Sequence, residues 1–147
     1  MTNTPVLTLR EDDAPRRQFE IFIGAPEAAA ISLALEDEHP QRPLTHDLFV
    51  LALERLAVSM VRVVLTHVSD GTYFAELTLA PDGGEEVVIS CRPSDAVALA
   101  LRSNCPVYAL DDLLDAVAEP VEESAEEEIL DEFRDFIENI SPEDFET

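Results

Sequence analysis

The chain has 147 residues, enough for one domain that buries a core of its own. It contains 32 acidic and 9 basic residues, all of the latter arginine, for a formal net charge of −23. Since proteins that bind nucleic-acid phosphates usually present a basic surface, this balance disfavours unaided binding to nucleic acid. No apolar run approaches the ~20 residues of a membrane-spanning helix, and residues 1–17 lack an apolar signal-type segment, so we expect a cytoplasmic protein that does not enter membranes.

The distribution of charge and apolar residues divides the chain into three parts. Residues 1–17 carry balanced charges and are expected to form a flexible N-terminal segment. Residues 18–118 contain the regular apolar patterns of a folded domain. Residues 119–147 hold 13 acidic residues and one arginine and form an acidic C-terminal segment. We therefore predict one globular domain between two tails.

The domain is predicted to begin with a strand and two helices. Every second position of residues 19–23 is apolar, which is typical of a strand, and the following Gly24-Ala25-Pro26 ends it. A helix is expected from there to about residue 37. A second helix is predicted over residues 45–57, with Thr45 as its N-cap. The face of this helix that is expected to meet the core consists of Phe49, Ala52, Leu53 and Leu56.

A β-meander is predicted next, from strands over residues 60–67, 72–79 and 86–91. Short turns that contain Asp and Gly join these strands, which indicates antiparallel pairing. The remaining predicted elements are a helix over residues 94–103, a short strand over 107–109 and a brief helix over 111–118. Helices packed on a largely antiparallel sheet define an α+β fold.

Part of this pattern occurs twice. Residues 27–33 and 95–101 carry similar sequences 68 positions apart. Each stretch follows a β-like run and a proline, at Pro26 and at Pro93. A strand, a tight turn and a helix of small residues are therefore expected twice, and we interpret the repeat as an internal duplication within one domain.

The acidic C-terminal segment is predicted to contain an amphipathic helix over about residues 125–139. Ser124 and Glu127 have the spacing of a capping box. Apolar side chains recur along one stripe of this helix, at Ile129, Phe133, Phe136, Ile137 and Ile140. The stripe needs a surface to cover it, which can be the protein's own core, a second subunit or another protein.

Two polar blocks, residues 42–48 and 92–96, lie at predicted helix starts. Each combines an arginine, a hydroxyl and a carboxylate, namely Arg42, Thr45 and Asp47 in the first and Arg92, Ser94 and Asp95 in the second. A helix N-terminus offers free amides and the positive end of a dipole, so an adjacent arginine can complete a seat for phosphate. Alternatively, Thr45 and Ser94 are plain caps, the carboxylates stabilise the dipole, and the arginines pair locally.

These blocks, together with Ile23-Gly24, Glu27-Ala28 and Asp70-Gly71-Thr72-Tyr73-Phe74, resemble the bifunctional nuclease domain family over residues 18–118. The resemblance implies an α+β fold with an internal duplication and self-association into a homo-oligomer. It also implies a nuclease activity, since some members are reported to cleave both DNA and RNA.

A nuclease with so acidic a surface needs a means of tolerating phosphate. We predict a divalent metal, Mg²⁺ or Mn²⁺, because hard cations take carboxylate ligands and invert the local charge. The predicted ligands are Glu27, Asp47 and Asp95. The catalytic set adds His46 as general base or further ligand, with Arg42 and Arg92 to neutralise the scissile phosphate.

Two other kinds of function stay open at this point. One is a non-catalytic binding or regulatory module that acts through protein contacts, which the acidic core and the lack of lysine favour. The other assigns the function to the acidic C-terminal helix, as a nucleic-acid mimic or as a docking element for a basic partner. The enzyme hypothesis requires the polar residues of the two blocks and Glu27 to converge in one cleft.

Overall fold

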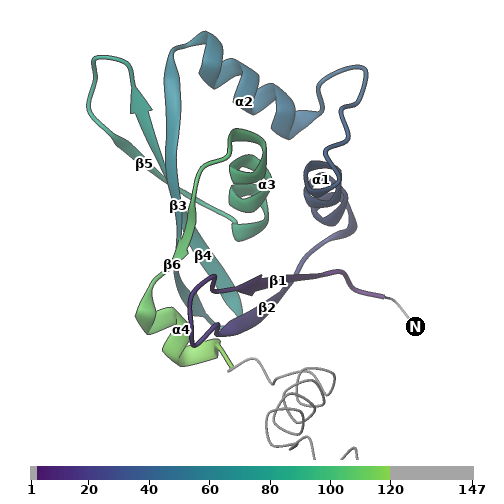
Figure 1. The fold of residues 1–147 in the computed structure, drawn as a ribbon, viewed down its shortest axis with the longest axis vertical. Coiled ribbons are helices and arrows are strands. Elements are labelled where there is room, and N and C mark those ends of the chain that lie inside the picture. Colours follow the sequence, from purple (N-terminus) through teal and green to yellow (C-terminus); the bar gives the residue numbers. More distant parts are fainter. Residues whose placement is uncertain (1–2, 120–147) are drawn as a thin grey trace, which may run out of the picture.

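A computed structural model describes residues 3–119 of the chain (Figure 1). This part forms the predicted α+β domain, and its strands make two sheets. The elements in chain order are β1 (Val6–Arg10), β2 (Gln18–Phe22), α1 (Ala25–Leu35), α2 (Thr45–Arg55), β3 (Val58–Ser69), β4 (Thr72–Pro81), β5 (Val87–Cys91), α3 (Pro93–Ser103), β6 (Val107–Ala109) and α4 (Asp111–Val117).

The main sheet contains the predicted antiparallel meander. Its strand order is β5-β4-β3-β6, with β4 antiparallel to both β3 and β5 and with β6 parallel to β3. Asp70 and Gly71 close the β3–β4 hairpin with positive φ angles of 50° and 77°, a conformation that glycine in particular adopts without strain. The Asp-Gly pair in the sequence therefore predicted this turn for the right physical reason.

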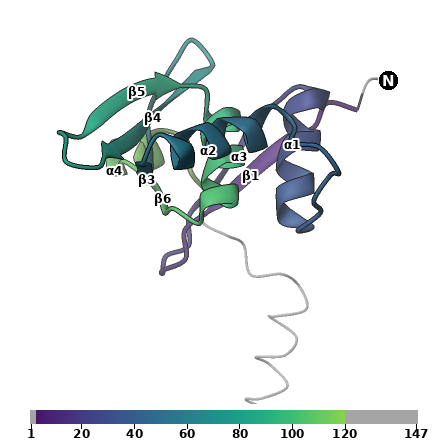
Figure 2. The same ribbon diagram turned by 90° about the horizontal axis from the view of Figure 1, so that it is seen from above.

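The core lies between the main sheet and α3. Val63 and Leu65 of β3 and Leu77 of β4 are almost fully buried. Helix α3 is buried on all sides along its middle, where its side chains are small or aliphatic: Ala96, Val97, Ala98, Leu99 and Ala100. Helix α3 also contacts α1 and α2, and α2 lies alongside α3, between α1 and the start of β3 (Figure 1, Figure 2). Helix α3 is therefore the central element of the domain.

The two copies of the repeated pattern take up corresponding structures. In both, a strand leads into a helix, β2 into α1 and β5 into α3. The first and last residues of α1 and of α3 are each 68 positions apart, which is the spacing of the repeat in the sequence. The two helix starts lie near each other, because Arg92, directly before α3, bonds to Glu27 in the first turn of α1. Gene duplication remains our interpretation of this correspondence.

The N-terminal residues differ from our expectation of a flexible segment over residues 1–17. Residues 6–10 form β1, which pairs antiparallel with β2 in a two-stranded sheet that places Leu7 opposite Ile21. Both of these side chains are buried in the core. The strand escaped prediction because its partner, and not its short sequence, stabilises it.

The face of α2 that meets the core also differs from the prediction. Phe49 and Leu56, expected to face the core, are 40% and 71% exposed. The half-buried side chains of α2 that pack against the core are Val50 and Leu53. A helix with apolar residues on several sides offers more than one possible inward face, and only packing against α3 decides between them.

The predicted C-terminal helix over residues 125–139 lies outside the described residues. Within residues 3–119, no helix has the length and apolar character needed to cross a membrane.

Candidate active site at three helix N-termini

Four of the predicted site residues meet where α1, α2 and α3 begin. Arg92 donates from Nη1 to Glu27 Oε1 at 3.1 Å and from Nε to Asp95 Oδ2 at 2.9 Å. His46 Nε2 lies 3.0 Å from Asp95 Oδ1. We refer to Glu27, His46, Arg92 and Asp95 as the Arg92 cluster. It joins residues that are far apart in the sequence through one guanidinium and one carboxylate.

The local sequence explains how the two carboxylates reach this position. Glu27 and Asp95 both lie in the first turn of a helix that has a proline at its start, α1 and α3 respectively. A carboxylate in the first turn is favoured by the helix dipole. Gly24 precedes α1, and a Cβ at that position would collide with the Glu27 carboxylate. The glycine therefore leaves room for Glu27 to fold back over the helix end.

The hydroxyl residues of the two blocks do not act as the predicted caps. The N-cap of α2 is Leu44 and that of α3 is Arg92, and neither helix start has a side-chain hydrogen bond from its N-cap residue. Thr45 is exposed, and Ser94 is buried within the first turn of α3. Two parts of the capping hypothesis hold: Asp47 and Asp95 lie in the first turns of their helices, and Arg92 pairs locally with Asp95.

The cluster is charged at neutral pH. Hydrogen bonds from its own backbone N–H and from Arg92 hold the pKa of Glu27 below its ordinary 4.5. Burial raises the pKa of Asp95, but hydrogen bonds from Arg92 and His46 outweigh it and bring the pKa below 3.8. The two carboxylates in turn raise the pKa of Arg92. Two carboxylates against one guanidinium leave the cluster net negative while His46 is neutral.

The cluster lies in an open cleft of about 570 Å³. The apolar part of its lining is formed by Pro26, Ala29, Ala30, Leu33, Pro43, Leu44 and Leu48. The side chain of Arg92 is 63% exposed, whereas that of His46 is 19% exposed. The cleft therefore combines apolar walls with one accessible cation and one largely covered imidazole.

The structure does not bring Asp47 and Arg42 into this cluster. Asp47 Oδ1 accepts a hydrogen bond from Arg102 Nε at 2.7 Å, and its Oδ2 accepts one from the backbone N–H of Leu44 at 2.9 Å. Arg42 is exposed, and within the described part of the chain it makes no ion pair or side-chain hydrogen bond. Asp47 therefore fastens α2 to α3, a structural role that its position after His46 in the sequence does not reveal.

Arg102 is the residue of this region that sequence reasoning missed. Its side chain is 10% exposed and donates to Asp47 and to the backbone carbonyls of Ala98 and Ala30. An arginine in the last turn of a helix is common, because its charge interacts favourably with the helix dipole. The sequence around Arg102 therefore did not indicate that this side chain joins three helices.

The described residues do not form the predicted three-carboxylate metal site. No group of three or more His, Cys, Asp or Glu side chains within residues 3–119 is arranged to hold a metal ion. Of the predicted ligands, Asp47 bonds to Arg102, and the Arg92 guanidinium bridges the other two, Glu27 and Asp95. A cation is thus already present where the metal was expected.

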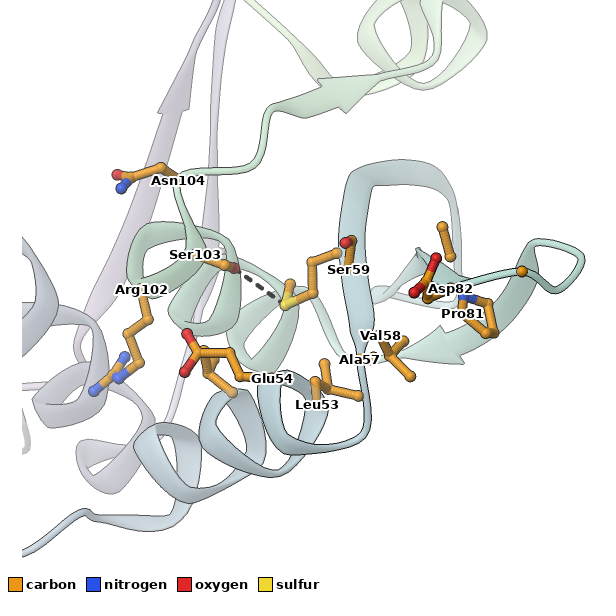
Figure 3. Close-up of a pocket in the computed structure, with 14 residues that line it drawn as sticks. Leu53, Glu54, Ala57, Val58, Ser59, Pro81, Asp82, Arg102, Ser103 and Asn104 are labelled. Carbon is orange, nitrogen blue, oxygen red and sulfur yellow. Dashed lines mark hydrogen bonds between the residues drawn. The ribbon is translucent and has the colours of Figure 1, made fainter.

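A second cavity, of about 850 Å³, lies at the opposite ends of α2 and α3 (Figure 3). Leu53, Glu54, Val58 and Arg102 line it together with Ser103, whose Oγ donates to Leu99 O at 2.6 Å and lies 3.1 Å from Met60 Sδ. None of the predicted site residues lies here. The larger cavity therefore does not coincide with the charged cluster, and we place the candidate active site at the cluster.

Comparison with known proteins gives relatives along nearly the whole chain. Two uncharacterized proteins from two strains of Mycobacterium tuberculosis are each 36% identical over 151 residues, a match that covers 97% of this chain and 89% of each relative. The bifunctional nuclease domain matches residues 7–122. This match begins inside β1, which agrees with a domain that includes the N-terminal strand.

The fold and the cleft define a class of protein, an acidic α+β domain whose charged residues meet at the N-termini of three helices. Within that class, the chain belongs to the bifunctional nuclease domain family. The residues that carried the resemblance in the sequence include Glu27, His46, Arg92 and Asp95, which meet in the cleft.

Proposed function

We propose that the chain is a nuclease that hydrolyses phosphodiester bonds of DNA and RNA in the cleft of the Arg92 cluster. Membership of the family supports the reaction class. The observation that carries the proposal is the contact of 3.0 Å between His46 Nε2 and Asp95 Oδ1. A histidine that a carboxylate holds in place can act as a general base.

We infer a role for each of these two residues from the contact. Because the low pKa of Asp95 keeps it ionised, it can only accept, so His46 Nε2 carries the hydrogen and Nδ1 is the basic nitrogen. In the proposed reaction His46 Nδ1 takes a proton from water. The water oxygen bonds to phosphorus while the bond from phosphorus to the leaving sugar oxygen breaks. That oxygen takes up a proton from solvent, and His46 then releases to solvent the proton that it took. Asp95 holds the imidazole in place and stabilises its charged form.

Arg92 is the proposed phosphate-binding group. Its exposed guanidinium can form paired hydrogen bonds with phosphate oxygens. Requirement for Mg²⁺ or Mn²⁺ stays a prediction from the sequence, and no step above depends on it. Arg42 and Asp47 are not part of the proposed catalytic set.

Cleavage assays of single variants test this proposal. Purified full-length chain is incubated with labelled RNA, single-stranded DNA and duplex DNA, each with Mg²⁺, with Mn²⁺ and with EDTA. We expect His46→Asn to lower the cleavage rate by ~10²-fold or more, the usual contribution of a general base. His39→Asn is the matched control, since His39 is exposed and lies outside the cleft. Equal cleavage by His46→Asn and wild type, from preparations freed of contaminating nucleases, would refute the assignment.

A second candidate function is a non-catalytic regulatory module that acts through protein contacts. The observation that favours it is the pairing of Arg92 with both Glu27 and Asp95, which leaves the cleft net negative and opposes phosphate binding. In this alternative the acidic C-terminal segment is the docking element for a protein partner. Absence of cleavage on all three substrates under every metal condition would favour the module over the enzyme.

A further inference from the structure

The main sheet has two edges, and they differ in how they are protected. At one edge, β6 has three residues and follows Pro106, which has no N–H to offer another strand. At the other edge lies β5, with five residues and without proline, charge or bulge. Proteins usually protect edge strands by such devices. β5 is thus open to pairing with a further strand (Figure 1).

The side chains of β5 are apolar and exposed on both faces. Val87 and Ile89 lie opposite Leu79 and Leu77 of β4, so they continue the face that carries the core. They are nevertheless 47% and 41% exposed, because no helix of residues 3–119 extends over β5. Val88, on the opposite face, is 56% exposed. An apolar strand exposed on both faces marks an interaction surface.

The charges that flank β5 indicate what would pair with it. Glu86 precedes the strand directly and Arg92 follows it directly, with only uncharged residues between them. If two copies of β5 pair antiparallel with Ile89 opposite Ile89, Glu86 of each copy lies opposite Arg92 of the other. Arg92 bonds to Glu27 and Asp95 through three of its five N–H groups, and its side chain is 63% exposed, so two N–H groups are left for Glu86 of the other copy. In this register the ends of the strand are therefore complementary in charge.

We propose that β5 is the contact between two copies of this chain, which pair antiparallel around a two-fold axis at Ile89. The four-stranded sheets of both copies then form one continuous sheet. Val87 and Ile89 of each copy lie beside those of the other on the helix side of this sheet, where they become covered. Glu86 contacts Arg62 of its own chain only at 3.8 Å and with both side chains exposed, which is a weak interaction that leaves it available.

Cross-linking tests the register. In the full-length chain with Cys91→Ser and Cys105→Ser, Ile89→Cys places two thiols opposite each other, at the Cα separation of about 4.5–5.5 Å that a disulfide can bridge. Val107→Cys on the other edge is the matched control, because Val107 is similarly exposed. We expect at least tenfold more cross-linked dimer from Ile89→Cys under mild oxidation. Equal cross-linking of both variants would overturn the proposal.

Sedimentation of the full-length chain tests the contact itself. We expect wild type to be a dimer, Glu86→Arg to weaken it by about tenfold, and Ile89→Lys to weaken it by ~100-fold or more, because like charges then meet on the axis. Circular dichroism checks that each variant is folded. A wild-type chain that stays monomeric, as when residues 120–147 of its own chain cover β5, would overturn the proposal, as would a folded Ile89→Lys variant that remains a dimer. These measurements do not depend on cleavage, so they stand apart from the proposed nuclease activity.

Discussion

Asp47 and Asp95 occupy the same place in the first turn of their helices, yet their carboxylates bond to different arginines. Asp95 lines the cleft and bonds to Arg92, whose side chain is largely exposed. Asp47 bonds instead to Arg102, whose side chain is 10% exposed. The same residue type at the same helix position is therefore a candidate catalytic group in one case and a structural link in the other.

Arg102→Met should destabilise the domain by roughly 2–3 kcal/mol, because it leaves the partly buried Asp47 carboxylate unpaired and removes the donor to the carbonyls of Ala30 and Ala98. Urea unfolding at pH 7 measures the change. Arg42→Met removes an exposed arginine and should stay within about 0.5 kcal/mol of wild type. Similar losses in both variants would contradict the structural role of Arg102.

The pH dependence of this difference follows from Asp47. Burial raises the pKa of Asp47, but hydrogen bonds from Arg102 and Leu44 lower it by more, to below 3.8. A carboxylate whose pKa is lowered on folding contributes stability above its unfolded pKa and loses it as the pH falls through the folded value. The difference in free energy of unfolding between wild type and Arg102→Met should therefore be largest near pH 7 and should decrease as the pH falls below 3.8.

At the scale of elements, α2 is the helix whose orientation was predicted least well. Leu53 and Leu56 were both expected to face the core, and only Leu53 packs against it. The sequence predicted that α2 is a helix with apolar residues. Which side of the helix faces the core depends on its packing against α3 and on the Asp47–Arg102 contact.

A matched pair of truncations measures this difference. Leu53→Ala should cost about 2 kcal/mol, the low end for buried leucines, since Leu53 is half-buried. Leu56→Ala makes the same chemical change at a site that is 71% exposed and should cost under about 0.5 kcal/mol. Chemical denaturation measures both losses of stability. Equal losses would mean that Leu53 and Leu56 both face the core, as the sequence predicted.

At the scale of the whole molecule, the net charge of −23 governs how the chain meets nucleic acid. Proteins that bind through many basic contacts release counterions, so their affinity drops by roughly 10³–10⁵ between 50 and 200 mM salt. This chain has nine arginines in all, and Arg92 and Arg102 are bonded to carboxylates. Salt should instead screen the repulsion between protein and nucleic acid.

We therefore expect the affinity for labelled single-stranded RNA to change by less than about threefold, or to rise, over the same range of salt. Fluorescence anisotropy with the His46→Asn variant measures binding without cleavage. A loss of affinity by several orders of magnitude would mean that a basic surface outside residues 3–119, or a clustering of the arginines, dominates binding.

By itself the sequence determined the α+β class, the meander, the repeated strand and helix, and the family, because these depend on local periodicity, turn residues and short motifs. It also indicated four residues that meet in the cleft. The tertiary structure alone decided that β1 belongs to the domain, that Asp47 bonds to Arg102, and that Arg42 stays outside the cluster. The physical reason is that a local pattern places a residue on its own helix or strand, whereas its partner comes from elements far away in the chain.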